Sequence, residues 1–251
     1  MDRVHSQSSR AIDQIDHVAV VVGEPAVNQR HTGILYRVVE SGPLEFLHLA
    51  WHCDLRRDRQ IRPEYCWAEL SVNKRRLIQL AAVCDAIAHE NSADAIRYGL
   101  SNPVGVFDTD TKKFLLGPTR GGLTCASFVL AVFDCARLQL VEYSGWPSPD
   151  AEDYQWQEAV LNTLMQMRAS NPNQVTQEHI DCVRDEAGSS ARFRPEQVAA
   201  AAAIRERRPV KYRYASLVGQ QIVRLLRGQP FEREIRMSVW DRVMRWIDRF
   251  R

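Results

Sequence analysis

The chain has 251 residues, of which 45% are hydrophobic and 25% are charged, and this composition is typical of a globular protein. It excludes a chain that is disordered over most of its length. No apolar run approaches the roughly 18 residues that cross a membrane, and the first residues, MDRVHSQSSRAIDQ, lack the apolar core of a secretory signal. The sequence therefore predicts a cytoplasmic protein.

The formal net charge of +2 is unevenly distributed. Residues 204–251 hold 13 Lys or Arg and 5 Asp or Glu, a surplus of 8, which leaves the first 203 residues at about −6. A basic tail of this kind binds nucleic acid, anionic lipid or an acidic partner, and it can equally bind the acidic body of its own chain. No nucleic-acid motif accompanies it.

The six cysteines include no CxxC pair and no disulfide spacing, and a chain of this length buries a core without disulfides. We expect all six to be free thiols: Cys53, Cys66, Cys84, Cys125, Cys135 and Cys182.

The first part of the chain predicts three consecutive strands. Residues 17–23 (HVAVVVG) and 34–41 (ILYRVVES) are β-branched runs, and residues 45–55 (EFLHLAWHCDL) follow a Gly-Pro break. Three strands in a row favour an antiparallel meander.

Helices dominate the rest of the pattern. Apolar residues at helical spacing predict helices over residues 73–89, 93–100, 153–168, 217–226 and 238–250, and Pro195 opens another. The loop 102–122 is long and rich in Gly and Pro, as functional loops often are. It leads to a helix that begins beside Cys125 and is apolar on every side, as expected of a buried helix.

Cys125 has the setting of a nucleophile. A helix amino terminus lowers a thiol pKa and offers amides to an oxyanion, and Gly121-Gly122 would let a substrate backbone come close. The alternative is a core cysteine on a buried helix.

A base must come from another segment. His17 starts the first predicted strand on the same face as small Ala19, and Glu40 at the end of the second strand can orient that imidazole. Taken singly, His17 can be an inert strand-end histidine and Glu40 a solvated carboxylate.

These three segments, HVAVVVGE, a strand ending in VVES, and LTCASFVLAVF, resemble in order the circularly permuted papain-like hydrolases of the NlpC superfamily. The closest branches are the lecithin retinol acyltransferase-like enzymes and the bacterial permuted amidases. The similarity covers residues 12–137, with an insertion around PAVNQRHTG. It implies Cys125 as nucleophile, His17 as base and Glu40 as the orienting residue.

A competing histidine lies on the third predicted strand. His48 begins a His-Leu-Ala pattern of its own and would replace His17 as base if the first strand belongs elsewhere. His48 and His52, with Cys53 or Asp54, are also an alternative metal site, although zinc sites usually show two ligand clusters and only one occurs here.

The last segment, residues 238–250, predicts an amphipathic helix with one apolar stripe: Val239, Trp240, Val243, Trp246, Ile247 and Phe250. We expect it to dock on its own chain, with a partner or an anionic membrane surface as the alternatives.

The sequence thus predicts an α+β fold, in which a small antiparallel sheet packs on the Cys125 helix in a permuted papain-like domain (1–145), followed by a helical extension with a basic tail (146–251). The predicted function is a cysteine hydrolase or acyltransferase acting on a peptide, lipid or other amide or ester substrate, and this chemistry requires no cofactor and no metal. The alternative is a non-catalytic binding or scaffold protein that uses its basic tail to hold a partner.

Overall fold

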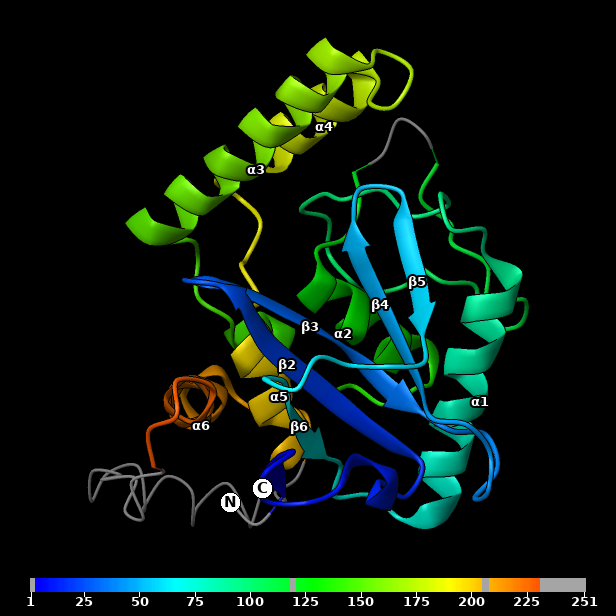
Figure 1. Cartoon of the computed structure of the whole chain (residues 1–251). Helices are drawn as coiled ribbons and strands as arrows, with labels where there is room; N and C mark the ends of the chain where they lie inside the picture. The colour runs from blue at the N-terminus through cyan, green and yellow to red at the C-terminus, as the bar shows by residue number, and fades with distance from the viewer. Residues whose placement is uncertain (1–2, 118–120, 205–207, 231–251) are drawn as a thin grey trace.

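The computed structural model describes residues 3–117, 121–204 and 208–230, and within them the chain forms one antiparallel six-stranded sheet and six α-helices (Figure 1). The sheet order is β1-β6-β2-β3-β4-β5. The strands are β1 (Val4–Ser6), β2 (Val18–Ala26), β3 (Gln29–Tyr36), β4 (Glu45–Trp51), β5 (Asp54–Asp58) and β6 (Cys66–Glu69). The predicted α+β class with an antiparallel sheet is confirmed.

Both faces of the sheet centre are buried. Along β2, Val20 and Val22 join the main apolar cluster, whereas Ala19 and Val21 join a second, smaller cluster with Trp67 on the opposite face. The continuous β-branched run of β2 is therefore explained by burial on two sides, because a half-exposed strand would alternate with polar residues.

Three helices cover the face of the main cluster: α1 (Lys74–Glu90), α2 (Cys125–Cys135) and α5 (Pro195–Ala203). Figure 1 shows α2 behind the sheet, with α1 and α5 on either side of it. Every residue of α2 except Asp134 is buried, as its apolar sequence predicts. Thr124 caps this helix by accepting a hydrogen bond from the Ser127 backbone N–H, so that α2 begins at Cys125.

The remaining helices follow the sheet in the sequence. Helices α3 (Ala151–Ser170) and α4 (Gln177–Glu186) lie side by side, and α6 (Tyr212–Leu226) packs on α5 (Figure 1). Helix α5 contacts β2, β3 and β6. The main apolar cluster therefore holds residues from both of the predicted parts of the chain, 1–145 and 146–251.

Three predicted elements differ from the structure. The second strand spans Gln29–Tyr36 and not 34–41, because its hairpin pairing with β2 starts at Gln29. The third divides into β4 and β5 at a turn where Cys53 has a positive φ of 53°. Residues 93–100 form no helix, because residues 97–101 run extended beside 121–123, with Leu123 N–H bonded to Arg97 O at 2.9 Å.

None of the helices in the described parts of the chain combines the length and apolar character needed to cross a membrane. The predicted helix at 238–250, with its apolar stripe, lies outside the described residues.

Candidate active site around Cys125

A cavity of about 460 Å³ lies at the first turn of α2 and extends to β3 and β4. Cys125 lines it together with Tyr98, and two histidines, His31 and His48, line it from the strands. The cavity therefore brings the predicted nucleophile together with one predicted base, His48, and with one histidine that the sequence analysis did not select.

The Cys125 side chain is held among hydrogen-bond donors in a buried position. Burial raises the pKa of its thiol to about 11, although the backbone amides of Thr32, Ala126 and Cys125 itself and the Tyr98 hydroxyl all favour the thiolate. The helix-terminal amides lower the pKa as expected, but the expectation of a lowered thiol pKa overall is wrong, because a residue that is only 6% exposed loses more hydration than the donors replace. The resting form of Cys125 is the neutral thiol.

The contact with Thr32 depends on how the sheet opens. Strand β3 pairs with β2 as far as its first residue, but it pairs with β4 only over residues 34–36. At the start of β3, the edge that faces β4 is therefore not paired with β4. Helix α2 packs against both strands. This opening places the first turn of α2 against the backbone of Thr32, one residue from His31.

A relay of three side chains crosses the sheet at this level. His31 Nε2 lies 2.8 Å from His48 Nδ1, and His48 Nε2 lies 3.0 Å from Asp58 Oδ2. Because an ionised carboxylate only accepts, His48 carries its proton on Nε2, and its Nδ1 then accepts from His31 Nε2–H. In this tautomer the lone pair of His31 Nδ1 is left to receive a proton.

Gly33 makes this relay possible. A Cβ atom at Gly33 would lie 2.6 Å from the His48 Cβ and 2.6 Å from Phe46 Cε2. The side chains of His48 and Phe46 therefore occupy space that a side chain at position 33 would need. Phe46 in turn stacks on the His48 ring at 4.3 Å between centroids. The packing therefore holds His48 against His31.

Both histidines are neutral near pH 7. Burial lowers the pKa of His31 to about 3, with His48 and Arg56 adding to the effect. Burial also lowers the pKa of His48, although Asp58 partly offsets it. The site thus holds a neutral thiol and a neutral imidazole, and not the ion pair usual for activated cysteines.

Two histidines hold the backbone of Tyr98 in place. Its backbone N–H donates to His52 Nδ1 at 3.3 Å, and His179 Nε2–H donates to its carbonyl at 2.9 Å. Gly122 packs against the backbone of Arg97 and Tyr98, where a Cβ would clash. A Cβ at Gly121 would meet Ser101 and Glu186, and neither glycine lines the cavity, so the expectation that the pair admits a substrate backbone is wrong.

The structure brings His17 and Glu40 together, but at another end of the sheet. His17 Nδ1–H donates to Arg37 O at 3.2 Å, and ligand atoms of Asp16, His17 and Glu40 lie within 4.8 Å of one another. The Lys74 ammonium already binds the Glu40 carboxylate. Neither His17 nor Glu40 lines the cavity.

The strand register explains this separation. Thr32, which contacts the Cys125 thiol, pairs with Val22, five residues along β2 from His17, a distance of about 16 Å in a strand. The geometry therefore does not support His17 as the base for Cys125.

The alternative metal ligands also separate. A register shift between Leu49 and Trp51 turns the end of β4, so that His48 faces Asp58 whereas His52 faces Tyr98 and Gln174. The two imidazoles do not share a ligand position.

The residue that the sequence analysis missed is His31. It begins a His-Thr-Gly pattern, comparable to the His-Leu-Ala pattern of His48, inside the segment PAVNQRHTG that the resemblance treats as an insertion. No sequence pattern identifies Asp58, because its strand, DLRRD, does not show which of its two carboxylates will contact a histidine.

Comparisons with family models, with curated proteins and with solved structures found no match to this chain. Its function is therefore inferred from the geometry of the cavity.

Proposed function

We propose that the protein is a thiol-dependent hydrolase or acyltransferase that acts on an amide, peptide or ester bond, with Cys125 as nucleophile and His31 as base. The observation that carries this proposal is the Asp58–His48–His31 relay, which ends in the same cavity as a cysteine at a helix amino terminus. A buried cysteine with a purely structural role requires no such relay.

In the proposed reaction, His31 Nδ1 removes the thiol proton as Cys125 Sγ attacks the substrate carbonyl. The resulting oxyanion accepts hydrogen bonds from the Cys125 backbone N–H and the Tyr98 hydroxyl, both of which lie at the thiol. His31 then gives the proton to the leaving group, and a thioester remains on Cys125. Water, or another acceptor, releases the acyl group with His31 again as base.

The neutral resting pair places a condition on this mechanism. Because the thiol pKa is high and the His31 pKa is low, proton transfer accompanies the attack and does not precede it. When His31 takes the proton, its Nε2–H keeps the hydrogen bond to neutral His48, which Asp58 holds in the accepting tautomer.

The same assignment supports the permuted papain-like description of the fold. With His31-Thr32-Gly33 as the first motif, the next strand supplies the polar residue His48, and the helix beginning at Cys125 comes last. This is the order of the resembled family, and it is obtained without an insertion between the base and its orienting residue.

The test uses p-nitrophenyl acetate as a generic acyl donor. The wild-type chain should release p-nitrophenol and carry an acetyl group on Cys125, found by peptide mass spectrometry. Cys125→Ala should abolish both signals, whereas Cys135→Ala, at the buried far end of the same helix, should keep them. Equal release by wild type and folded Cys125→Ala would contradict the proposal and favour a non-catalytic binding protein.

A further inference from the structure

The wall of the Cys125 cavity is lined by arginine. Among the residues that the structure describes, five arginines line it together with one acidic residue, Asp58, which is already bonded to His48; the arginines are Arg30, Arg56, Arg62, Arg192 and Arg194. Their own acidic partners, such as Asp54 and Asp153, are not part of the lining. A group that enters the cavity therefore meets more arginine than acidic side chains.

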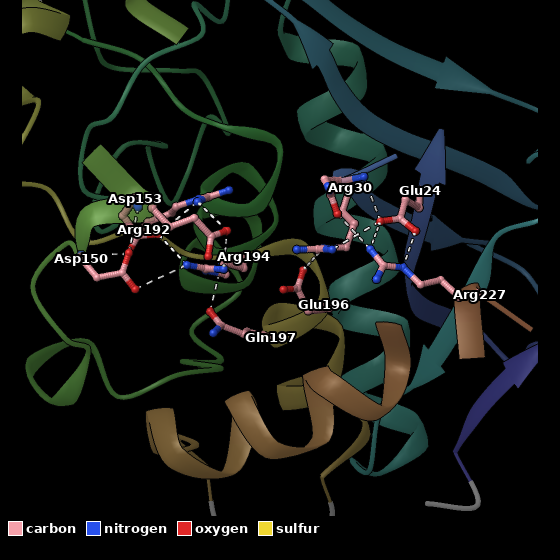
Figure 2. Close-up of polar contacts among 11 residues, drawn as sticks. Glu24, Arg30, Asp150, Asp153, Arg192, Arg194, Glu196, Gln197 and Arg227 are labelled. Atoms are coloured by element: carbon pink, nitrogen blue, oxygen red, sulfur yellow. Dashed lines mark hydrogen bonds and ion pairs between the residues drawn. The ribbon is translucent and has the colours of Figure 1, made fainter. Parts of the chain in front are cut away.

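Arg192 is the arginine best fixed for binding. Its side chain is only 11% exposed, its Nη1 donates to Asp153 Oδ1 at 3.1 Å, and its guanidinium carbon lies 4.4 Å from the centre of the Trp156 ring. Figure 2 shows it beside Arg194, which bonds the same Asp153 oxygen at 2.9 Å. A guanidinium held this way loses little further entropy on binding a ligand.

Two positive charges thus share one buried carboxylate. The other acids of the group, Asp150 and Glu152, have side chains that are mostly exposed, so water weakens their attraction. Burial lowers the pKa of Arg192, and the charge of Arg194 lowers it further. An anion in the cavity would give the two guanidinium groups a second counter-charge that is shielded from water.

Arg192 also lies near the reacting atoms. Burial and the Cys125 thiol raise the pKa of the Tyr98 hydroxyl, whereas the Arg192 charge opposes the rise. Arg192 and Thr124, the cap of α2, line the same cavity wall, and they also meet in a smaller adjoining pocket. Arg192 therefore lines the part of the cavity beside the amino terminus of α2, where the attacked carbonyl of the proposed reaction would lie.

We propose that the acyl donor carries a carboxylate beside the scissile bond and that Arg192 binds this carboxylate. The inference rests on the proposed function and narrows its substrate class to acidic acyl donors. Asp153 and Trp156 act as positioning residues, because they orient the fork of N–H donors that a planar carboxylate accepts in pairs.

A matched pair of alkylating reagents tests the charge preference without a known substrate. Iodoacetate and iodoacetamide place the same methylene on sulfur and differ in the carboxylate. The ratio of their rates at Cys125, measured on the full chain at one alkaline pH by peptide mass spectrometry, should exceed the ratio for a free thiol such as glutathione. Since both reagents need the same thiolate, the ratio does not depend on the thiol pKa.

Arg192→Gln should lower this ratio by about tenfold, the effect of one charge-assisted hydrogen bond. Arg184→Gln removes the same charge from exposed α4 and should leave the ratio unchanged. In wild type, succinate should slow the iodoacetamide reaction more than succinamide does, and this measurement needs no variant.

Equal ratios in wild type and Arg192→Gln, or equal protection by succinate and succinamide, would overturn the inference and leave the proposed function intact. If Cys125 reacted with neither reagent, both would be overturned.

Discussion

Asp58 fixes where the protons lie on the two relay histidines. It accepts from His48 Nε2–H, and this one contact makes His48 Nδ1 an acceptor and His31 Nε2 a donor. A residue at the end of β5 thereby determines that Nδ1 is the nitrogen of His31 without a proton. The Asp58 side chain is half-exposed, so water screens part of its charge.

We expect Asp58→Asn to lower the rate of Cys125 acylation by p-nitrophenyl acetate by about tenfold, which corresponds to about 1.4 kcal/mol. The amide lacks the charge that stabilises imidazolium, and its N–H₂ favours the wrong tautomer of His48. Asp181→Asn, which loses an exposed ion pair with Arg184 on α4, is the control and should keep the wild-type rate. Equal losses in both variants would show that general charge, and not the relay, is responsible.

Gly33 gives a second prediction for a single residue. Gly33→Ala should destabilise the fold by about 1 to 3 kcal/mol and also reduce acylation, because the new methyl group displaces His48 and Phe46. Gly117→Ala is the matched control, since no described residue other than its chain neighbours has an atom within 4 Å of the added Cβ, and it should change stability by less than about 0.5 kcal/mol. Urea unfolding measures both, and a neutral Gly33→Ala would refute the packing argument.

Ion pairs tie the β2–β3 hairpin to the helices. Figure 2 shows Arg30, next to His31 in the sequence, between Glu24 of the hairpin and Glu196 of α5, with Arg227 after α6 bonded to Glu24. Arg30 and Glu196 are buried at 2.8 Å from each other, whereas Arg227 is exposed. The two links should therefore contribute unequally to stability.

Glu196→Ala should destabilise the protein by about 3 kcal/mol, because it leaves the buried Arg30 guanidinium short of a partner. Arg227→Ala removes an exposed partner and should cost less than about 1 kcal/mol. Chemical denaturation of the two variants measures the difference. Equal costs would mean that burial does not set the strength of these pairs.

The sequence predicted elements whose signal is local. The β-branched run of β2, the apolar α2 and the Asn73-capped α1 were found because each pattern is set within its own residues. Strand boundaries in β3 were missed, because hairpin pairing decides them. The helix predicted over 93–100 is wrong because this segment forms hydrogen bonds with residues 121–123, and such non-local bonds leave no signal in the local sequence.

The candidate site divides in the same way. Cys125 was found from its place before an apolar helix, whereas His31 and Asp58 acquire their roles only when β3, β4 and β5 lie side by side. His17 matched the family pattern as well as His31 does, and only the register of β2 against β3 separates them.

At the scale of the whole molecule, burial keeps most histidines neutral. Burial lowers the pKa of five of the seven histidines: His5, His31, His48, His52 and His179. Because the unfolded chain then binds more protons than the folded one, stability is fully present above about pH 6.5 and falls as the pH drops. For His179, whose folded pKa is about 4, the loss continues to about pH 4.

We therefore expect steep acid destabilisation between about pH 6.5 and 4.5, where each fully buried histidine contributes up to about 1.4 kcal/mol per pH unit. His179→Gln keeps a donor for the Tyr98 carbonyl but does not titrate, so it should make the slope shallower by up to that amount. Urea unfolding at several pH values measures the slope. A wild-type stability that is flat over this window would contradict the assignment of neutral buried histidines.

The central claim is that His31, and not His17, serves Cys125. The rate of Cys125 acylation by p-nitrophenyl acetate should fall by about 10² to 10⁴ in His31→Ala and stay near the wild-type value in His17→Ala, with circular dichroism confirming that both fold. Loss of acylation in His17→Ala with retention in His31→Ala would contradict the account.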